Sequence, residues 1–322
     1  MHFDVFNGDA DGIIALLQLR LATPKKSTII TGVKRDISLL KHVPIENAAT
    51  VTVLDISLEK NNEALQQLLN NDVKVFYVDH HKTGEIPSSH LLTTLINTDA
   101  NTCTSLLVNQ YLKGRFVHWA IVAAFGDNMT ASAIKLCEQQ GLSAKQQEKL
   151  MKLGIYINYN GYGRTVDDLH FHPADLYQKL MVFPDPLTLF STTDKPDHDI
   201  FSSLEQAYLQ DMAKAQSAQV LVDNIISKVV LLNDEPWARR ISGVFGNELA
   251  NQSPDKAHAV LTLNNDNTYT VSLRAPLNNK QGAVDICGQF PTGGGRAGAA
   301  GINQLPKKML ESFIDTMTQY YH

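Results

Sequence analysis

Apolar, β-branched runs alternate with amphipathic stretches along the first 135 residues of the chain. The strand-like runs cover residues 3–6, 28–31, 51–54 and 73–78. Apolar positions recur with helical spacing over residues 12–21, 58–69, 104–112 and 117–125. Continuous apolar runs are typical of strands buried on both faces. Their alternation with helices predicts a mostly parallel, helix-covered sheet.

The pattern changes after this region. Segments rich in aromatic residues, His and Pro are followed by a helix-like stretch over residues 201–226, and strand-like runs return at 228–232, 257–263 and 269–274. The polar residues 264–267 predict a hairpin turn between the last two runs. We therefore expect an α/β protein with two domains. A mostly parallel, helix-covered sheet over 1–135 is joined by a helical region, 136–228, to a smaller α/β domain over 229–322.

Composition narrows the class of protein. The chain has 322 residues, 43% of them hydrophobic and 19% charged, which fits a folded protein. Its net charge of -5 argues against a surface that coats nucleic acid, although metal ions could supply positive charge at a local anion site. The three cysteines have no CxxC spacing, so neither a disulfide framework nor a zinc knuckle is expected. The amino-terminal residues do not resemble a signal peptide, and no stretch is apolar enough to span a membrane, so we expect a cytoplasmic location.

Acidic residues and histidines follow three of the predicted strands. Asp9 and Asp11 come after the first run, Asp55 after the third, and Asp79 and His80 after the fourth. An aspartate after a strand is often only a turn former or a helix cap. Several carboxylates gathered at one edge of a sheet would repel one another, however, and need cations to compensate them. A carboxylate-rich set with imidazole and no thiolate suits Mn²⁺ or Mg²⁺ better than structural zinc.

A glycine-rich run in the second domain is the other candidate site. Gly293, Gly294, Gly295 and Arg296 begin a stretch of small residues that continues to Gly301. Successive amides of glycines can form a nest for phosphate oxygens, and an arginine adds a charged fork. The small residues after Arg296 would suit a helix packed tightly behind an anion loop. The alternative is a flexible loop without a ligand.

With these motifs the chain resembles the DHH phosphoesterase superfamily, in the branch with a DHHA1 carboxyl-terminal domain. That branch includes RecJ-like exonucleases, oligoribonucleases, cyclic-dinucleotide phosphodiesterases and exopolyphosphatase-related proteins. Residues 9–12 resemble the first motif, Asp55 the second, residues 79–81 the third and Asp127 the fourth, while residues 293–301 resemble the DHHA1 glycine motif. The resemblance covers about residues 1–135 and 229–322.

The resemblance implies a pair of Mn²⁺ ions, with Mg²⁺ as the other candidate. Asp55 would bridge the two ions and Asp9 would bind the first. Asp11, His80 and Asp127 would bind the second.

The resemblance also implies roles for residues that surround the ions. Asp79 would orient a histidine, and His81 would face the substrate phosphate. Arg274, at the end of a predicted strand, matches an arginine that such proteins point towards substrate, although it could equally be a surface residue.

Two positions depart from the family pattern. Val5 stands where many relatives have a histidine ligand of the first metal, so we expect that ion to be held more loosely, with Asn7 or water in the gap. Arg296 stands where the glycine motif usually continues with histidine. Anion binding should survive this change, because arginine keeps both a donor and a charge.

These features predict a metal-dependent phosphodiesterase that cleaves short oligonucleotides or dinucleotides held between two lobes. Its partner would be a short single-stranded nucleic acid or a phosphate-containing small molecule, with no membrane involved, and the chain could form a homodimer. Inorganic polyphosphate is the alternative substrate, because it needs the same metals but no base-stacking surface. A non-catalytic nucleotide-binding regulatory protein is the alternative of a different class.

Overall fold

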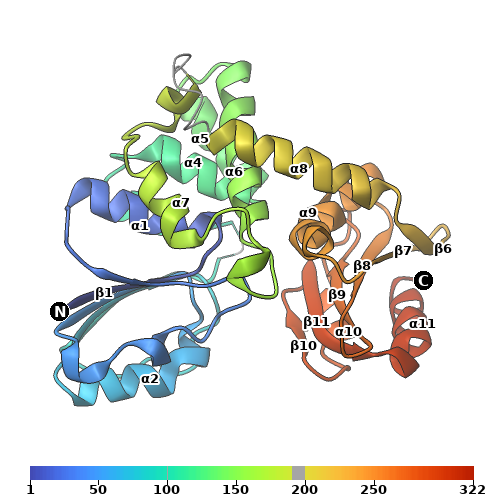
Figure 1. The fold of residues 1–322 in the computed structure, drawn as a ribbon, viewed down its shortest axis with the longest axis horizontal. Coiled ribbons are helices and arrows are strands. Elements are labelled where there is room, and N and C mark those ends of the chain that lie inside the picture. Colours follow the sequence, from blue (N-terminus) through green and yellow to red (C-terminus); the bar gives the residue numbers. More distant parts are fainter. Residues whose placement is uncertain (100, 191–199) are drawn as a thin grey trace. The chain divides into compact units, whose positions relative to one another are not determined.

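The computed structural model describes residues 1–99, 101–190 and 200–322. The chain divides into two compact units, Met1–Glu205 and Gln206–His322 (Figure 1). The expected helical region 136–228 is divided between them, because residues up to 205 belong to the first unit and the rest to the second. Within the described ranges, no helix is both long enough and apolar enough to cross a bilayer.

The first unit contains a five-stranded sheet in the order β2-β1-β3-β4-β5. Its strands are β1 (His2–Phe6), β2 (Thr28–Ile30), β3 (Thr50–Leu54), β4 (Lys74–Asp79) and β5 (Leu92–Ile96), and each neighbouring pair is parallel. Four of these strands match apolar runs of the sequence. β5 was not expected, because half-buried Leu92 and Ile96 flank exposed threonines at the edge of the sheet.

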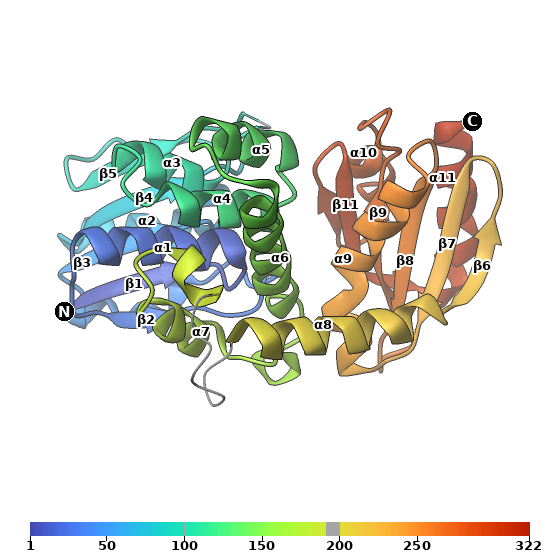
Figure 2. The same cartoon turned by 90° about the horizontal axis from the view of Figure 1, so that it is seen from above.

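Alternating side chains of these strands enter two apolar layers. Phe3 and Val5 of β1 pack, with Val53 of β3, against the helix α2 (Leu58–Asn70). On the opposite face lies α1 (Ala10–Ala22), which is buried from Ala10 to Arg20 because further helices cover it (Figures 1 and 2). The parallel sheet is therefore covered on both faces, as expected for continuous apolar strands.

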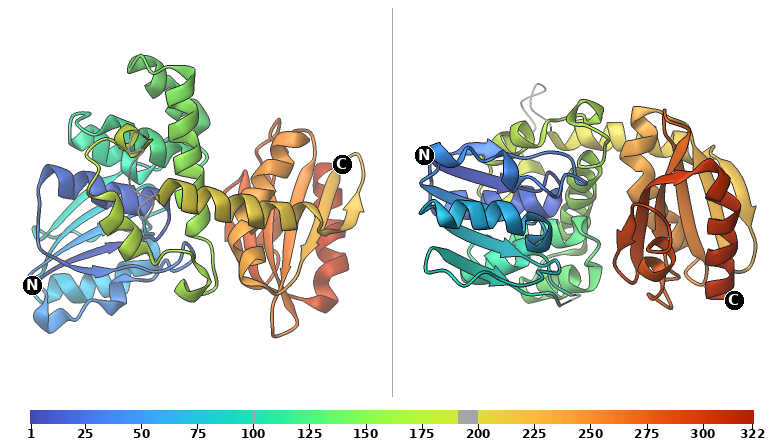
Figure 3. Two further views of the ribbon diagram at one scale, coloured as in Figure 1. Left: turned by 45° about the horizontal axis from the view of Figure 1, so that its top comes forward. Right: turned by 90° about the horizontal axis from the view of Figure 1, so that it is seen from below.

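The covering helices of the first unit follow β5 in the chain. They are α3 (Thr104–Tyr111), α4 (Val117–Gly126), α5 (Thr130–Gln139), α6 (Ala144–Asn160) and α7 (Pro173–Leu180). α1 contacts α3, α4 and α7, and α6 crosses α4 closely (Figure 3). Gly126 and Gly154 make this crossing possible, because a Cβ added at Gly154 would lie 2.1 Å from the carbonyl oxygen of Val122.

The second unit contains a mixed six-stranded sheet in the order β10-β11-β9-β8-β7-β6. Its strands are β6 (Gln219–Asp223), β7 (Ser227–Leu232), β8 (Ala257–Leu263), β9 (Thr268–Arg274), β10 (Gly293–Gly295) and β11 (Ala299–Pro306). Residues of α10 (Ala283–Cys287) and α11 (Leu310–Tyr321) share one apolar core with this sheet. α9 (Pro236–Gln252) packs on β8 and β9. The expected α/β class is confirmed for both units.

Two sequence predictions in this part of the chain were wrong. The helix expected over 201–226 is α8 (Ile200–Gln216), which ends before β6 because residues 219–223 pair with β7 and form the edge strand of the sheet. The helix expected behind the glycine run is instead the strand β11, paired with β9. The small residues allow β11 to lie close to β9, because a Cβ added at Gly301 would lie 2.7 Å from the carbonyl oxygen of Val271.

Candidate metal centre

The acidic motifs of the first unit meet at one edge of its sheet. β1, β3 and β4 are neighbours and parallel, so the residues that follow them emerge side by side. The chain leaves β1 towards β2 on one side and returns to β3 on the other. The carboxyl ends of β1 and β3 thus form the switch point at which open α/β sheets bind ligands.

His80 points its Nε2 atom at three carboxylates. This atom lies 3.4 Å from Asp55, 3.8 Å from Asp11 and 3.8 Å from Asp127. The Nδ1 atom of His80 lies 2.9 Å from the carbonyl oxygen of Thr102. A carbonyl oxygen only accepts, so Nδ1 carries a proton and Nε2 is the nitrogen available to a metal ion. This tautomer is the one that a metal-binding histidine needs.

Asp11 is held by the amino terminus of α3. Its two carboxylate oxygens accept from the backbone N–H groups of Thr104 and Ser105, both at 2.7 Å. The Thr104 hydroxyl donates to Asp55 at 3.0 Å. The helix cap is therefore a carboxylate from α1, and Thr104 supports a second carboxylate of the cluster.

Asp127 joins the cluster from the end of α4. Its backbone N–H donates a helical hydrogen bond to the carbonyl oxygen of Ala123. The next residue, Asn128, has a φ of 61°, and the chain turns there. Asp11, His80 and Asp127 each offer an atom within 4.8 Å of the others'. These are the residues that the family resemblance assigns to the second ion.

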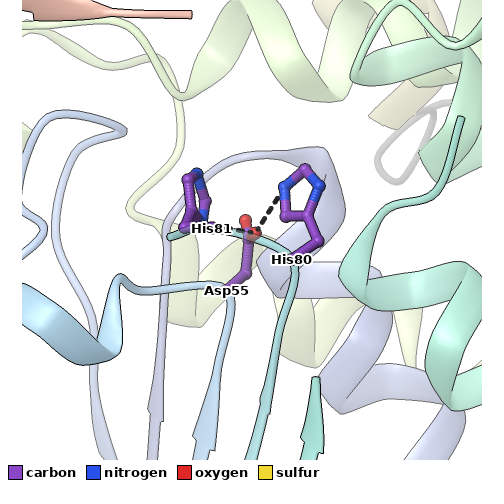
Figure 4. A group of neighbouring side chains, drawn as sticks. All are labelled: Asp55, His80 and His81. Atoms are coloured by element: carbon purple, nitrogen blue, oxygen red, sulfur yellow. Dashed lines mark ion pairs between the residues drawn. The ribbon is translucent and has the colours of Figure 1, made fainter. Parts of the chain in front are cut away.

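Asp55 occupies the middle of the cluster, with the rings of His80 and His81 beside its carboxylate (Figure 4). Its φ of 59° is uncommon for a residue other than glycine, which is typical of a constrained functional position. Burial, and next the charge of Asp11, raises the pKa of Asp55 well above its usual range. A cation would relieve this repulsion.

Asp79 is fully buried and accepts a hydrogen bond of 2.7 Å from Nδ1 of His81. Its other oxygen, Oδ2, is buried and has no hydrogen-bond partner within the described ranges. The side chain of His81 is 32% exposed, whereas that of His80 is 3% exposed. His81 is therefore the histidine of the pair that a substrate can reach.

Asp9 lies beside the cluster but its oxygens are already engaged. Oδ1 accepts from the N–H groups of Asp11 and Gly12, which makes Asp9 the cap of α1. Oδ2 accepts from Nζ of Lys34 at 2.5 Å. Burial raises the pKa of Asp9, but the Lys34 ammonium and the helix N–H groups lower it more, to about 2.

Lys34 is the member of the site that sequence analysis missed. Its ammonium also lies 2.9 Å from Oδ1 of Asn158 and 3.5 Å from Asp127. Burial lowers the pKa of Lys34, but the charges of Asp9, Tyr162 and Asp127 together raise it well above its usual value. Nothing in the local pattern after β2 distinguishes this lysine from a solvated one.

The donor set at Asp11, Asp55, His80 and Asp127 fits a divalent cation of the Mn²⁺ or Mg²⁺ type. Two overlapping groups could hold an ion, Asp11 with His80 and Asp127, and Asp55 with His80 and His81, and each offers carboxylate oxygen and imidazole nitrogen. Cys103 is buried nearby, and burial followed by the charge of Asp11 raises the pKa of its thiol well above the usual range. A neutral thiol is a poor ligand, so the site lacks the thiolate that a structural zinc favours.

The candidate substrate-binding residues of the second unit lie on its strands. Gly293, Gly294 and Gly295 form β10, and Arg296 is exposed in the turn to β11. The guanidinium of Arg274 donates to Oδ1 of Asn247 and to the carbonyl oxygen of Gly243, so it ties β9 to α9. Arg274 is thus a structural link as well as a candidate substrate ligand.

No protein-family model and no curated protein matches the sequence. Similar folds occur among solved structures. A RecJ exonuclease bound to manganese has a TM-score of 0.61 at 15% identity, covering 99% of this chain and 90% of that one. An exopolyphosphatase-related protein from Bacteroides fragilis has a TM-score of 0.52 at 13% identity, with coverage of 99% and 92%.

A pGpG-specific phosphodiesterase from Vibrio cholerae has a TM-score of 0.52 at 11% identity, and the match covers 100% of this chain and 99% of that one. Nearly the whole of the described chain is therefore similar to these structures. The two-domain α/β fold that the motifs implied is therefore confirmed.

Proposed function

We infer that this protein is a metal-dependent phosphoesterase that hydrolyses short oligonucleotides or dinucleotides. The inference rests on its fold and on its set of candidate metal ligands. The observation that carries the proposal is the convergence of His80 with Asp11, Asp55 and Asp127 at the switch point of the sheet. A divalent cation bound there would lower the pKa of a bound water and offset charge on the phosphoryl oxygens.

The protein residues hold the reacting groups in place. The hydrogen bond from Nδ1 to the carbonyl oxygen of Thr102 keeps Nε2 of His80 directed into the carboxylate cluster. Asp79 holds Nδ1 of His81, so that Nε2 of His81 is the atom offered to a phosphate oxygen. No side chain of this set has to act as a covalent nucleophile.

A cavity of about 610 Å³ lies beside the loop after β2, and none of the proposed metal ligands lines it. The loop that carries Lys34 lines it on both sides of that residue. The basic side chains of Arg35, Lys41 and His42 lie in its wall together with apolar ones such as Ile29 and Ile37. Inorganic polyphosphate would use the basic groups alone. A nucleotide would use both kinds of contact, so we favour it.

The glycine hairpin is proposed to bind a phosphate group of the substrate. Arg296 is exposed and lies directly after the three glycines, where its guanidinium can form bidentate hydrogen bonds with phosphate. Arg296→Ala should therefore raise KM by about tenfold and leave kcat nearly unchanged. An equal fall in kcat without a change in KM would contradict this role.

A product-resolved screen tests the proposed activity. Metal-free protein is supplied with Mn²⁺ and then with dinucleotides, longer oligonucleotides, cyclic dinucleotides or polyphosphate. We expect hydrolysis of the shortest nucleotides, and none with Asp55→Asn. Preferential cleavage of polyphosphate would instead support the exopolyphosphatase alternative. Nucleotide binding without hydrolysis of any of these substrates would instead support the alternative of a non-catalytic regulatory protein.

A further inference from the structure

The ammonium group of Lys34 lies among oxygen atoms in the manner of a bound cation. Nζ is 2.5 Å from Oδ2 of Asp9, 2.9 Å from Oδ1 of Asn158 and 3.5 Å from Oδ1 of Asp127. The ring of Tyr162 adds a cation–π contact, with Nζ 5.5 Å from its centroid. These groups come from three separate parts of the first unit, so the position of Nζ is defined by the tertiary structure.

The backbone of Lys34 is fixed as well. Its N–H donates to the carbonyl oxygen of Gly161 at 2.8 Å, and its own carbonyl oxygen accepts from Asn7 at 3.1 Å. The neighbouring loops touch, since a Cβ added at Gly8 would lie 1.8 Å from the carbonyl oxygen of Gly32. The side chain is 23% exposed. Lys34 is therefore held in place before any ligand arrives.

Among the residues that the structure describes, both carboxylate oxygens of Asp9 already accept hydrogen bonds. One oxygen of Asp9 caps α1 and the other accepts from Lys34. The side chain of Asn7 is also used, because Oδ1 accepts from the N–H of Asp9 while Nδ2 donates to Lys34. Val5 is fully buried in the apolar layer against α2, so it completes the core where many relatives outside the RecJ-like branch have a histidine ligand.

We propose that the Lys34 ammonium stands in place of one of the two ions, so that the centre takes a single divalent cation on Asp11, Asp55, His80 and Asp127. This inference rests on the proposed metal centre and reduces the number of metal ions expected in it from two to one. Lys34 supplies the positive charge next to Asp9 and Asp127 permanently. The single ion compensates the carboxylates around His80.

Metal counting on the whole chain tests the proposal. Metal-free wild-type protein, Lys34→Gln, Asp9→Asn and the control Lys60→Gln are dialysed against Mn²⁺, and bound manganese is measured by mass spectrometry. Lys60 is an exposed lysine of α2 in the same unit. Electron paramagnetic resonance then distinguishes an isolated Mn²⁺ from an exchange-coupled pair, independently of activity, and circular dichroism confirms that each variant is folded.

We expect one isolated Mn²⁺ per chain in the wild type, in Lys60→Gln and in Asp9→Asn, because Asp9 is the counter-ion of Lys34 and not a metal ligand. In Lys34→Gln, the count should rise to two, since a second ion replaces the missing ammonium. Two coupled ions in the wild type, or a single ion in Lys34→Gln, would overturn the substitution of metal by lysine. Absence of manganese from the wild type would instead overturn the metal centre itself.

Discussion

At the residue scale, each ligand of the proposed metal centre is oriented by a second bond. Asp11 accepts from two amides of α3, and His80 bonds the carbonyl oxygen of Thr102. Side chains held in this way lose little freedom when they bind a ligand, which favours both affinity and correct geometry. The effects of single substitutions should therefore be large and specific.

His80→Ala is expected to remove metal binding and turnover together. The variant loses the imidazole nitrogen directed at the three carboxylates and leaves their repulsion uncompensated. Mn²⁺ affinity, measured by calorimetry, should fall at least about 100-fold. His90→Ala, which changes an exposed histidine of the same unit, is the matched control and should bind as the wild type does. Retained affinity in His80→Ala would remove this residue from the ligand set.

A buried ion pair between Asp4 and Arg20 gives the first unit a pH-dependent stability. Nε of Arg20 donates to Asp4 at 2.9 Å, and His2 lies beside them. Burial raises the pKa of Asp4, but His2 and Arg20 lower it more, from 3.8 to about 2. Because the folded pKa is the lower one, the stabilisation is present above pH 3.8 and is lost as the pH falls towards 2.

Asp4→Asn is expected to reduce the free energy of unfolding by about 3 kcal/mol at neutral pH, because it leaves the buried Arg20 charge without its counter-ion. Urea unfolding of both proteins at several pH values measures this difference. The difference should shrink as the pH approaches the folded pKa of Asp4, where the wild-type carboxylate is itself protonated. A difference that is constant down to pH 2 would contradict the lowered pKa.

At the scale of elements, the crossing of α4 and α6 positions Asp127. The two helices approach closely at Gly126 and Gly154, and Asp127 follows α4 directly. A larger residue at the crossing must separate the helices, because the added atom would meet backbone and not a movable side chain. The helix packing therefore determines how close one metal ligand lies to the others.

Gly154→Ala is expected to destabilise the protein by about 1–3 kcal/mol and to weaken Mn²⁺ binding. Gly246→Ala in α9 is the matched control. A Cβ there would have only ordinary contacts of 3.6 Å and longer, so the better helix propensity of alanine should stabilise the protein by up to about 1 kcal/mol. Thermal unfolding and metal titration measure both effects. A neutral Gly154→Ala would show that the crossing can relax without moving Asp127.

At the scale of the whole molecule, the two units have separate cores and separate spectroscopic reporters. Trp119 is buried in the first unit and Trp237 is half-buried in the second. All the proposed metal ligands belong to the first unit. Metal binding should therefore stabilise the two units to different extents.

Addition of Mn²⁺ at about 100 times its Kd should stabilise the first unit by about 2.7 kcal/mol, which corresponds to a Tm increase of about 5–10 °C. The change is followed by tryptophan fluorescence in Trp237→Phe, which retains the reporter of the first unit. The converse variant, Trp119→Phe, reports the second unit and should show a smaller shift. Equal shifts in the two variants would mean that the units unfold together.

The sequence predicted four strands of the first sheet and three strands of the second, and it also indicated the residues that are proposed as metal ligands. Apolar runs predicted four strands of the first sheet, and each acidic motif followed such a run or a helix. Parallel neighbours bring their carboxyl ends to one edge, so local pattern and strand order sufficed to gather Asp11, Asp55 and His80. The edge strands β5 and β6 were not predicted, because half-exposed strands carry weak apolar signals, and β10 and β11 were not predicted because their glycine-rich sequence indicated an anion loop and a helix.

The tertiary structure alone decided which groups share the space beside Asp9 and how the glycine run is used. Lys34 is 25 residues from Asp9 and 124 residues from Asn158 in the chain, so no local pattern could predict that its ammonium lies between them. The glycine run became a hairpin because β11 pairs with β9, a contact between distant segments. Local patterns specify the elements and their chemistry, whereas the occupant of a site depends on contacts that form only when those elements pack.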